Sequence, residues 1–216
     1  MAMVRGELQS KDFQEKKVAA QKLLFLIHES LASQTGSISD VQWALFNLIE
    51  LMGSSNFDCK RISYVVVPLV VDKSDPLVQL LPNIFRKDLR AMSDPLQVSI
   101  SLSCLSRVCS EELASLLYKD LLPLYTASRP LVRRKVCLLS YKFFLHYPDG
   151  IPELVPYLSD RLKDTKTGVQ ISAVTAIHEI SRLNPRLFLV TIPSLFELFS
   201  TTKSNWLIIK LIKLVS

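Results

Sequence analysis

A proline recurs every 33 to 41 residues between positions 82 and 193. It lies in four short apolar segments, LLPNIF, LLPLYT, LVPYLS and TIPSLF, at Pro82, Pro123, Pro156 and Pro193. Proline has no N–H to donate, and it kinks a helix when it lies in the helix interior. The same residue at the same place in four segments indicates a repeated structural unit. We expect each segment to be a helix kinked by its proline.

A second, more apolar amphipathic segment alternates with the proline-containing ones. Its equivalent positions are 37, 35, 37 and 37 residues apart: Cys59, Leu96, Leu131, Gly168 and Asn205. Proline is well tolerated in the first helical turn, where its N–H would have no partner. We therefore expect long helices to begin at Pro95 and Pro130, each directly after a chain breaker.

A single helix pair cannot bury its apolar faces, whereas stacked pairs bury them together. The period is short for HEAT or armadillo repeats and close to that of tetratricopeptide repeats. The Trp, Gly and Tyr positions of tetratricopeptides are missing, however, as is the Thr-Pro-Leu-His of ankyrin repeats. The expected kink favours HEAT-like units. The sequence predicts an all-α fold, a right-handed HEAT/armadillo-like α-solenoid of stacked helix pairs, with residues 1–216 as one segment.

The chain ends in SNWLIIKLIKLVS, where eight of the twelve residues from Asn205 onward are large and apolar. Such a helix is normally buried on more than one side. We interpret it as the inner helix of a pair whose next neighbour is missing, so that the chain is the N-terminal part of a longer solenoid. A terminal helix covered by a partner is the alternative. Trp206, Ile209 and Ile212 are expected to pack on the missing repeat, and their exposure should cause weak self-association.

The composition and the missing motifs exclude several classes of protein. The longest apolar run, Val65 to Val71, is too short to span a bilayer, and the first twenty residues contain no secretory signal. There is no glycine-rich phosphate loop and no hydrolase or metalloprotease motif. The three histidines lie in separate units, and the four cysteines have neither zinc-site nor disulfide spacing, which indicates buried free thiols. We expect no catalytic site, no metal and no cofactor, and therefore not an enzyme.

Three stretches of the sequence indicate a particular family rather than an α-solenoid in general. They are residues 42–64, 80–89 and 205–215. In this order and spacing they resemble the N-terminal trunk of the large adaptins, subunits of the heterotetrameric adaptor complexes of vesicle coats. They are most similar to the delta subfamily of the third adaptor complex. Its segments Trp-Ala-x-Phe-x-x-Ile-Glu, Lys-Arg-Ile-Gly-Tyr, Arg-Lys-Asp-Leu and Asn-Trp-x-x-Ile-Lys-x-x-Lys fall at Trp43–Glu50, Lys60–Tyr64, Arg86–Leu89 and Asn205–Lys213.

The opening MVRGELQSKD also resembles the Leu-Val-Arg-Gly start of this family. Ser63 stands where the family has glycine, and Leu45 and Leu48 are further departures, which indicates a divergent member.

The resemblance implies a scaffold. Adaptin trunks hold a small sigma-type subunit and pack against a second large, beta-type adaptin and the medium subunit. An Arf-family GTPase and anionic lipid recruit the complex to Golgi and endosomal membranes, where it sorts cargo for vesicle-mediated transport, in the delta subfamily toward lysosomes and related organelles. We therefore expect a cytoplasmic protein, peripheral on these membranes, with no nucleic acid among its partners.

Two basic clusters are candidate contacts. The net charge of +6 suggests an anionic partner. Lys16 and Lys17, with Lys22, lie in a segment that resembles the phosphoinositide-contacting segment of alpha-adaptin, although only Lys16 and Lys17 match its lysine cluster, whose third lysine is Val18 here. The three lysines are therefore candidates for anionic-lipid contact, and a solvated helix face is the alternative. The second cluster is Arg133, Arg134 and Lys135. It either contacts a partner or forms a ladder between repeats, pairing with loop carboxylates such as Asp94 or Asp164, and we favour the ladder.

Two other functions fit a basic α-solenoid. A HEAT-repeat protein of nuclear transport or nucleic-acid binding would use the positive charge, but the basic residues are irregularly placed and are not interleaved with aromatic ones. A scaffold for a regulatory enzyme, such as a phosphatase, is the other. Only the adaptin-like segments argue against it.

Overall fold

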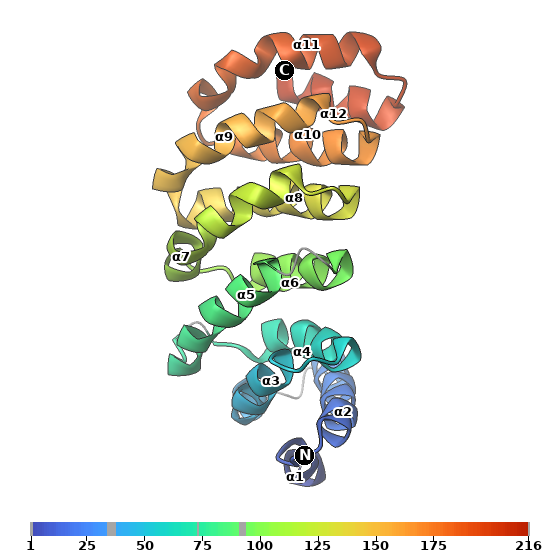
Figure 1. The fold of residues 1–216 in the computed structure, drawn as a ribbon, viewed down its shortest axis with the longest axis vertical. Coiled ribbons are helices and arrows are strands. Elements are labelled where there is room, and N and C mark those ends of the chain that lie inside the picture. Colours follow the sequence, from blue (N-terminus) through green and yellow to red (C-terminus); the bar gives the residue numbers. More distant parts are fainter. Residues whose placement is uncertain (1, 34–37, 73, 91–93, 216) are drawn as a thin grey trace. The chain divides into compact units, whose positions relative to one another are not determined.

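A computed structural model describes residues 2–33, 38–72, 74–90 and 94–215, and within these ranges the chain is helical without strands (Figure 1). It forms two compact units, one up to Asp88 and one from Leu89 onward. The all-α class predicted from the sequence is confirmed. The prediction that residues 1–216 form one continuous segment stays a prediction, and the two units are described separately.

Unit 1 is built around a packed set of helices. Helix α2 packs on α1 and α4, and α3 packs on α4. Buried leucine, isoleucine, valine and alanine side chains fill the space between them, with Leu23, Leu48 and Val67 all fully buried. The helices of unit 1 are α1 (Ala2–Leu8), α2 (Phe13–Ser33), α3 (Leu45–Met52), α4 (Phe57–Val70) and the first part of α5 (Leu81–Arg90).

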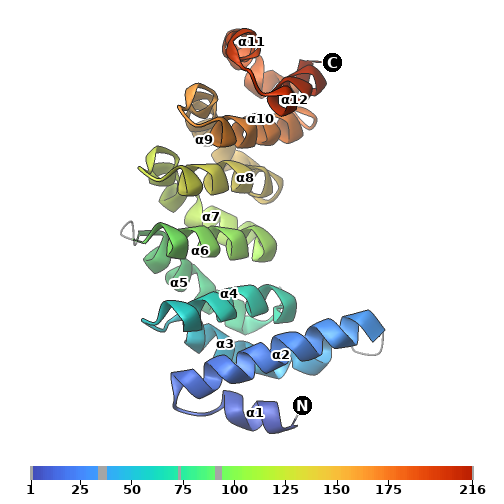
Figure 2. The same cartoon turned by 90° about the vertical axis from the view of Figure 1, so that its right-hand side faces the viewer.

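Unit 2 shows the predicted repeat directly. Its inner row contains four helices, which pack in sequence order, each on the next (Figure 2). They are α6 (Pro95–Val108), α8 (Pro130–His146), α10 (Thr167–Ser181) and α12 (Asn205–Val215). The outer row contains α7 (Glu111–Leu121), α9 (Ile151–Asp160) and α11 (Ile192–Thr201). The stacked helix pairs of a HEAT/armadillo-like solenoid are therefore present, and α6 and α8 begin at Pro95 and Pro130 as expected.

The recurring proline has a different role from the one expected. Of the four recurring prolines, only Pro156 lies in a helix interior, within α9. Pro82 and Pro193 are the second residues of α5 and α11, each directly after a 3-10 helix, and Pro123 is the second residue of the 3-10 helix Leu122–Thr126. At such a junction the regular α-helical hydrogen bonding is already interrupted, so the missing N–H costs less than it would in a helix interior. The proline therefore marks a junction between 3-10 and α-helix in three of the four units rather than a kink.

The described residues also bear on the cysteines, on membrane-spanning segments and on metal sites. Cys59, Cys104, Cys109 and Cys137 are buried free thiols, as predicted. None of the helices in the described ranges is both long enough and apolar enough to cross a membrane. The described residues also contain no group of three His, Cys, Asp or Glu side chains placed to hold a metal ion.

Candidate functional site

Two of the adaptin-like segments meet in a buried polar triad inside unit 1. Lys60 on α4 donates from Nζ to both carboxylate oxygens of Asp88 on α5, at 2.6 Å each, and the Tyr64 hydroxyl donates to Oδ2 of Asp88 at 2.6 Å. The Lys60 and Asp88 side chains are only 4% and 1% exposed. A buried charge is tolerated only when it is paired and hydrogen-bonded. The triad therefore fixes α4 against α5 and gives both segments a structural role.

Helix α4 also accommodates Ser63, the serine that stands where the family has glycine. Ser63 is fully buried, so the position admits only a small side chain. Its hydroxyl donates to the backbone carbonyl of Lys60 at 2.7 Å, one turn earlier. The oxygen that serine adds relative to glycine is thus satisfied locally, as buried polar groups require.

The N-terminal segments also contact one another within unit 1. The guanidinium of Arg5 lies 5.3 Å from the ring centroid of Trp43, a cation–π contact. Lys16 on α2 forms an ion pair with Glu50 on α3. Trp43 and Glu50 are the first and last residues of the adaptin-like segment Trp43–Glu50. The first end of this segment therefore contacts α1, and its last end contacts α2.

The three lysines proposed for lipid contact are all paired with carboxylates. The Lys16 side chain is 4% exposed and bound to Glu50, so lipid contact by Lys16 is not supported. Lys17 lies 3.6 Å from Asp58, and Lys22 lies 2.7 Å from Glu7. Their positive charges are therefore largely balanced inside unit 1, and only Lys17 and Lys22 remain accessible.

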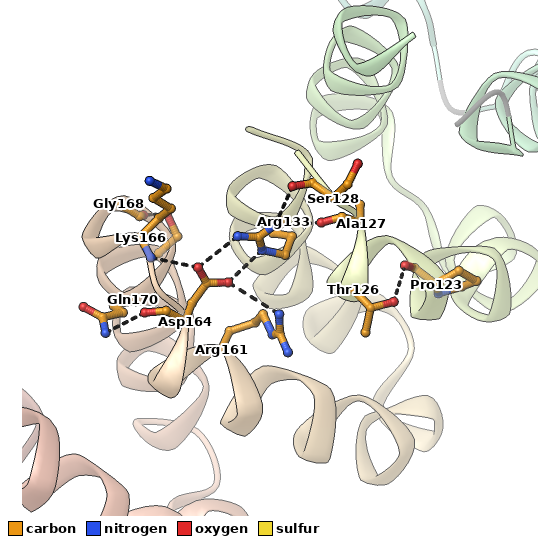
Figure 3. Close-up of polar contacts among 11 residues, drawn as sticks. Pro123, Thr126, Ala127, Ser128, Arg133, Arg161, Asp164, Lys166, Gly168 and Gln170 are labelled. Carbon is orange, nitrogen blue, oxygen red and sulfur yellow. Dashed lines mark hydrogen bonds and ion pairs between the residues drawn. The ribbon is translucent and has the colours of Figure 1, made fainter. Parts of the chain in front are cut away.

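In unit 2, Arg133 on α8 is the centre of a ladder between repeats (Figure 3). Its Nε and Nη2 donate to the two carboxylate oxygens of Asp164 at 2.7 and 3.0 Å, a bidentate pair. Its Nη1 donates to the carbonyls of Ala127 and Ser128 at 2.7 and 3.0 Å. This ion pair joins two successive repeats, as the ladder interpretation of the cluster expects for Arg133 and Asp164. The other carboxylate considered, Asp94, instead caps α6 by accepting from the N–H groups of Leu96 and Gln97.

The electrostatics keep Asp164 ionised. Burial raises the pKa of its carboxyl, but the hydrogen bonds from Arg133 and from the Lys166 N–H, together with the charges of Arg133 and Arg161, outweigh burial. The net result is a pKa below the ordinary value for aspartate. Asp164 is therefore a permanent anion near neutral pH that joins α8 to the start of α10.

Residues 2–216 match the family described as the adaptin N terminal region. The chain belongs to this adaptin family. It is 37% identical over 175 residues to the AP-3 complex subunit delta-1 of Bos taurus, an alignment that covers 81% of the chain and 14% of the bovine subunit. The predicted resemblance to the delta subfamily is confirmed, and the chain spans only a small part of its relative's length.

The structural comparisons agree with this adaptin assignment. A homology model of the full-length AP-3 complex in an intermediate open conformation contains a similar chain, with a TM-score of 0.80 and 31% identity over 94% of this adaptin chain and 34% of that one. A designed armadillo repeat protein is similar in fold alone, with a TM-score of 0.70 and 15% identity over 99% and 97% of the two chains.

The other two members of the second basic cluster differ from Arg133. Lys135 donates to the Ser103 hydroxyl on α6 at 2.9 Å, and Arg134 is exposed. Neither is paired with a carboxylate in the part of the adaptin chain that the structure describes. The ladder thus accounts for Arg133 and leaves the neighbouring positive charges available to a partner.

Helix α12 has one buried and one exposed apolar face. Leu207 and Leu211 are 0% and 1% exposed. Trp206, Ile209 and Ile212 are 60%, 47% and 54% exposed, so the face expected to pack on a further repeat is uncovered in this adaptin chain. What covers it stays a proposal.

We expect this face to make the isolated chain self-associate weakly. Light scattering should show a mass that rises with concentration, because contact between two such faces removes large apolar side chains from water. The double variant Trp206→Asp/Ile209→Asp should raise the dissociation constant at least about tenfold, since exposed tryptophans often dominate interfaces. The variant Lys203→Gln is the matched control, and a wild type that stays monomeric at the highest concentration contradicts the prediction.

Proposed function

We propose that this adaptin chain is part of a non-catalytic scaffold subunit of a heterotetrameric vesicle-coat adaptor complex of the AP-3 type. Such a subunit acts in intracellular protein transport and sorts cargo from Golgi and endosomes toward lysosome-related organelles. The observation that carries the proposal is the adaptin match over residues 2–216, joined to the similarity with an AP-3 delta subunit. The buried triad supports it, because it gives the delta-like segments a physical role in one fold.

The proposed partners are a sigma-type small subunit, a second large, beta-type adaptin and the medium subunit. Stable assemblies of this kind use large, mainly apolar interfaces. Each unit carries large apolar side chains on its surface. In unit 1, Phe25 and Phe46 are 68% and 56% exposed, and in unit 2 the α12 face and Phe196 are uncovered. These side chains are available for subunit contacts.

Co-expression with the sigma-type subunit of the same organism tests the proposal. Size exclusion with light scattering is expected to show a stable one-to-one complex. If the folded chain does not copurify, the same experiment with a full-length delta-type chain decides between a binding surface elsewhere in that chain and a wrong assignment. Failure of both chains to bind any sigma-type subunit would overturn the proposal.

Peripheral binding to Golgi or endosomal membranes, with an Arf-family GTPase, belongs to the same proposal. In this chain the lipid candidates are Lys17 and Lys22, and each must leave a carboxylate partner to reach a headgroup. A free lysine near an anionic surface contributes about 1 kcal/mol. Because both lysines are paired, we expect a smaller contribution.

The variant Lys17→Gln/Lys22→Gln should therefore weaken co-sedimentation with phosphoinositide-containing vesicles by less than about threefold. A loss of more than about tenfold would show that both lysines exchange their carboxylates for lipid. The variant Lys163→Gln/Lys203→Gln removes the same charge from unit 2 and is the control.

A further inference from the structure

A pocket of 550 Å³ lies between α10, α11 and α12 in unit 2. Its walls are mainly apolar and include the 3-10 helix that precedes α11. Ile177 and Phe188 are buried and form its floor, whereas Leu189 and Phe196 are exposed and form its rim. Pockets of about 300–1,000 Å³ with apolar walls and a few polar groups are typical of sites for small organic ligands.

The repeat register identifies which residues of the neighbouring repeat are equivalent to the lining of the pocket. A shift of 37 residues relates Pro148 to Pro185, each of which begins a 3-10 helix, and Pro156 to Pro193 on the outer helices. The shift therefore holds from the end of the inner helix through the connection to the outer helix. Residues 37 apart in these two repeats occupy equivalent positions.

Two differences between the repeats change the wall of the pocket. Ser181 stands where α8 has Phe144, and Arg182 stands where α8 has Leu145. A hydroxymethyl group thus replaces a phenyl ring, and a cation replaces an aliphatic side chain. Protein interiors are normally filled by side chains, so the smaller residue leaves space. The pocket and its charge therefore follow from the sequence of this repeat.

The charged groups that line the pocket are positive. Arg182 and Lys213 belong to the C-terminal ends of α10 and α12, which pack on each other. Residues 167–215 contain five lysines and arginines and two glutamates. One of these, Glu179, lies 3.7 Å from Arg182, whose side chain is 70% exposed. Such an exposed ion pair contributes little, so the guanidinium is available to a ligand.

We propose that this pocket binds a single-chain anionic lipid, of which a free fatty acid is the simplest. The alkyl chain packs on the apolar floor, and the carboxylate pairs with Arg182 and Lys213. A guanidinium is suited to this role, because it donates two parallel hydrogen bonds to one carboxylate. The positive charge selects an anion, and the apolar floor selects an alkyl chain. The site is independent of the proposed coat function.

Titration with cis-parinaric acid, a fluorescent fatty acid, tests the proposal. The fluorescence should rise saturably, and palmitate should displace the probe. The variant Ser181→Phe should weaken binding at least about tenfold, because it fills the pocket without changing the charge. Ser115→Phe on α7 is the matched control and should change binding less than about twofold. Ser115 and Ser181 both donate to the backbone carbonyl three residues earlier.

A second pair of variants tests the contact with the carboxylate. Arg182→Leu introduces the residue of the preceding repeat and should weaken binding at least about tenfold, since a charge-assisted hydrogen bond is lost. Arg186→Leu removes an exposed cation that does not line the pocket and should change binding less than about twofold. Circular dichroism and urea unfolding should show that all variants remain folded.

Four outcomes would overturn the proposal. The first is an equal loss of binding in Ser181→Phe and Ser115→Phe, and the second is displacement of the probe by hexadecanol as effectively as by palmitate. The third is a full-length delta-type chain that does not bind the probe although this chain does, because a later segment of that chain then fills the pocket. The fourth is self-association that Ser181→Phe abolishes in a chain that does not bind the probe, which would assign the pocket to a second copy.

Discussion

Replacing Asp88 by alanine should lower the free energy of unfolding of unit 1 by about 3–5 kcal/mol, the largest effect we expect from a single substitution. The change leaves the Lys60 ammonium almost fully buried without its carboxylate, and it leaves the Tyr64 hydroxyl without the acceptor at 2.6 Å. The penalty is mainly that of an unpaired buried charge, which exceeds the value of the lost contact itself. Urea unfolding, followed by circular dichroism, measures it.

Two matched variants decide whether this explanation is correct. The double variant Lys60→Met/Asp88→Leu removes both charges and should recover at least about half of the lost stability, because well-packed apolar side chains often replace a buried ion pair without loss. Glu197→Gln breaks a pair whose two side chains are 65% and 67% exposed, and it should cost less than about 1 kcal/mol. A single Asp88→Ala variant as stable as wild type would contradict the structural role of the triad.

The second largest effect is expected for Asp164→Asn, which should destabilise unit 2 by about 2–3 kcal/mol at neutral pH. The substitution removes the negative charge from the bidentate pair, and the Arg133 side chain, 11% exposed, then has no counter-ion. The amide keeps one oxygen to accept from the Lys166 N–H, so the cap at 2.9 Å is retained in part. Asp164→Ala removes this acceptor as well and should cost more.

The stability difference between wild type and Asp164→Asn depends on pH with a definite sign. Because the pKa of Asp164 is lowered in the folded chain, its charge contributes fully to stability above the unfolded value of about 3.9. That contribution is lost as the pH falls through the lower, folded pKa. The gap between wild type and Asp164→Asn, measured by urea unfolding, should therefore be constant from pH 7 to about 5 and shrink below about 4. A gap that widens on acidification would refute the assignment.

The sequence was sufficient for the elements that depend on local chemistry. The starts of α6 and α8 were predictable because a proline in the first turn and, for α6, the Asp94 cap act within a few residues. The inner row of unit 2 was predictable because its apolar positions repeat with the helix period. The Arg133–Asp164 pair was among the pairings that the ladder interpretation allowed, whereas the choice of Arg133 over its neighbours and of Asp164 over Asp94 was not determined by the sequence.

The remaining features depend on packing between segments, which a single sequence does not display. Pro82 and Pro193 were expected to kink helices, yet the chain places a 3-10 turn directly before each of them. Lys16 was expected to lie on the surface, because its partner Glu50 is 34 residues away and nothing near Lys16 in the sequence indicates the pair. Asp88 lay within a recognised segment, but nothing local indicated that Lys60, 28 residues earlier, would be buried against it.

The ion pairs of the two units also form in a definite order during synthesis of the chain. Four of them connect a cation to a carboxylate that follows it 34, 28, 30 or 31 positions later: Lys16 to Glu50, Lys60 to Asp88, Arg90 to Asp120 and Arg133 to Asp164. During translation, each of these four cations is therefore synthesised about one repeat before the carboxylate with which it pairs. Because N-terminal segments fold first during synthesis, the links close one after another in the direction of translation. For Lys16, Lys60 and Arg133, which are buried or nearly so, this spacing limits the time during which the unpaired cation can form a wrong ion pair.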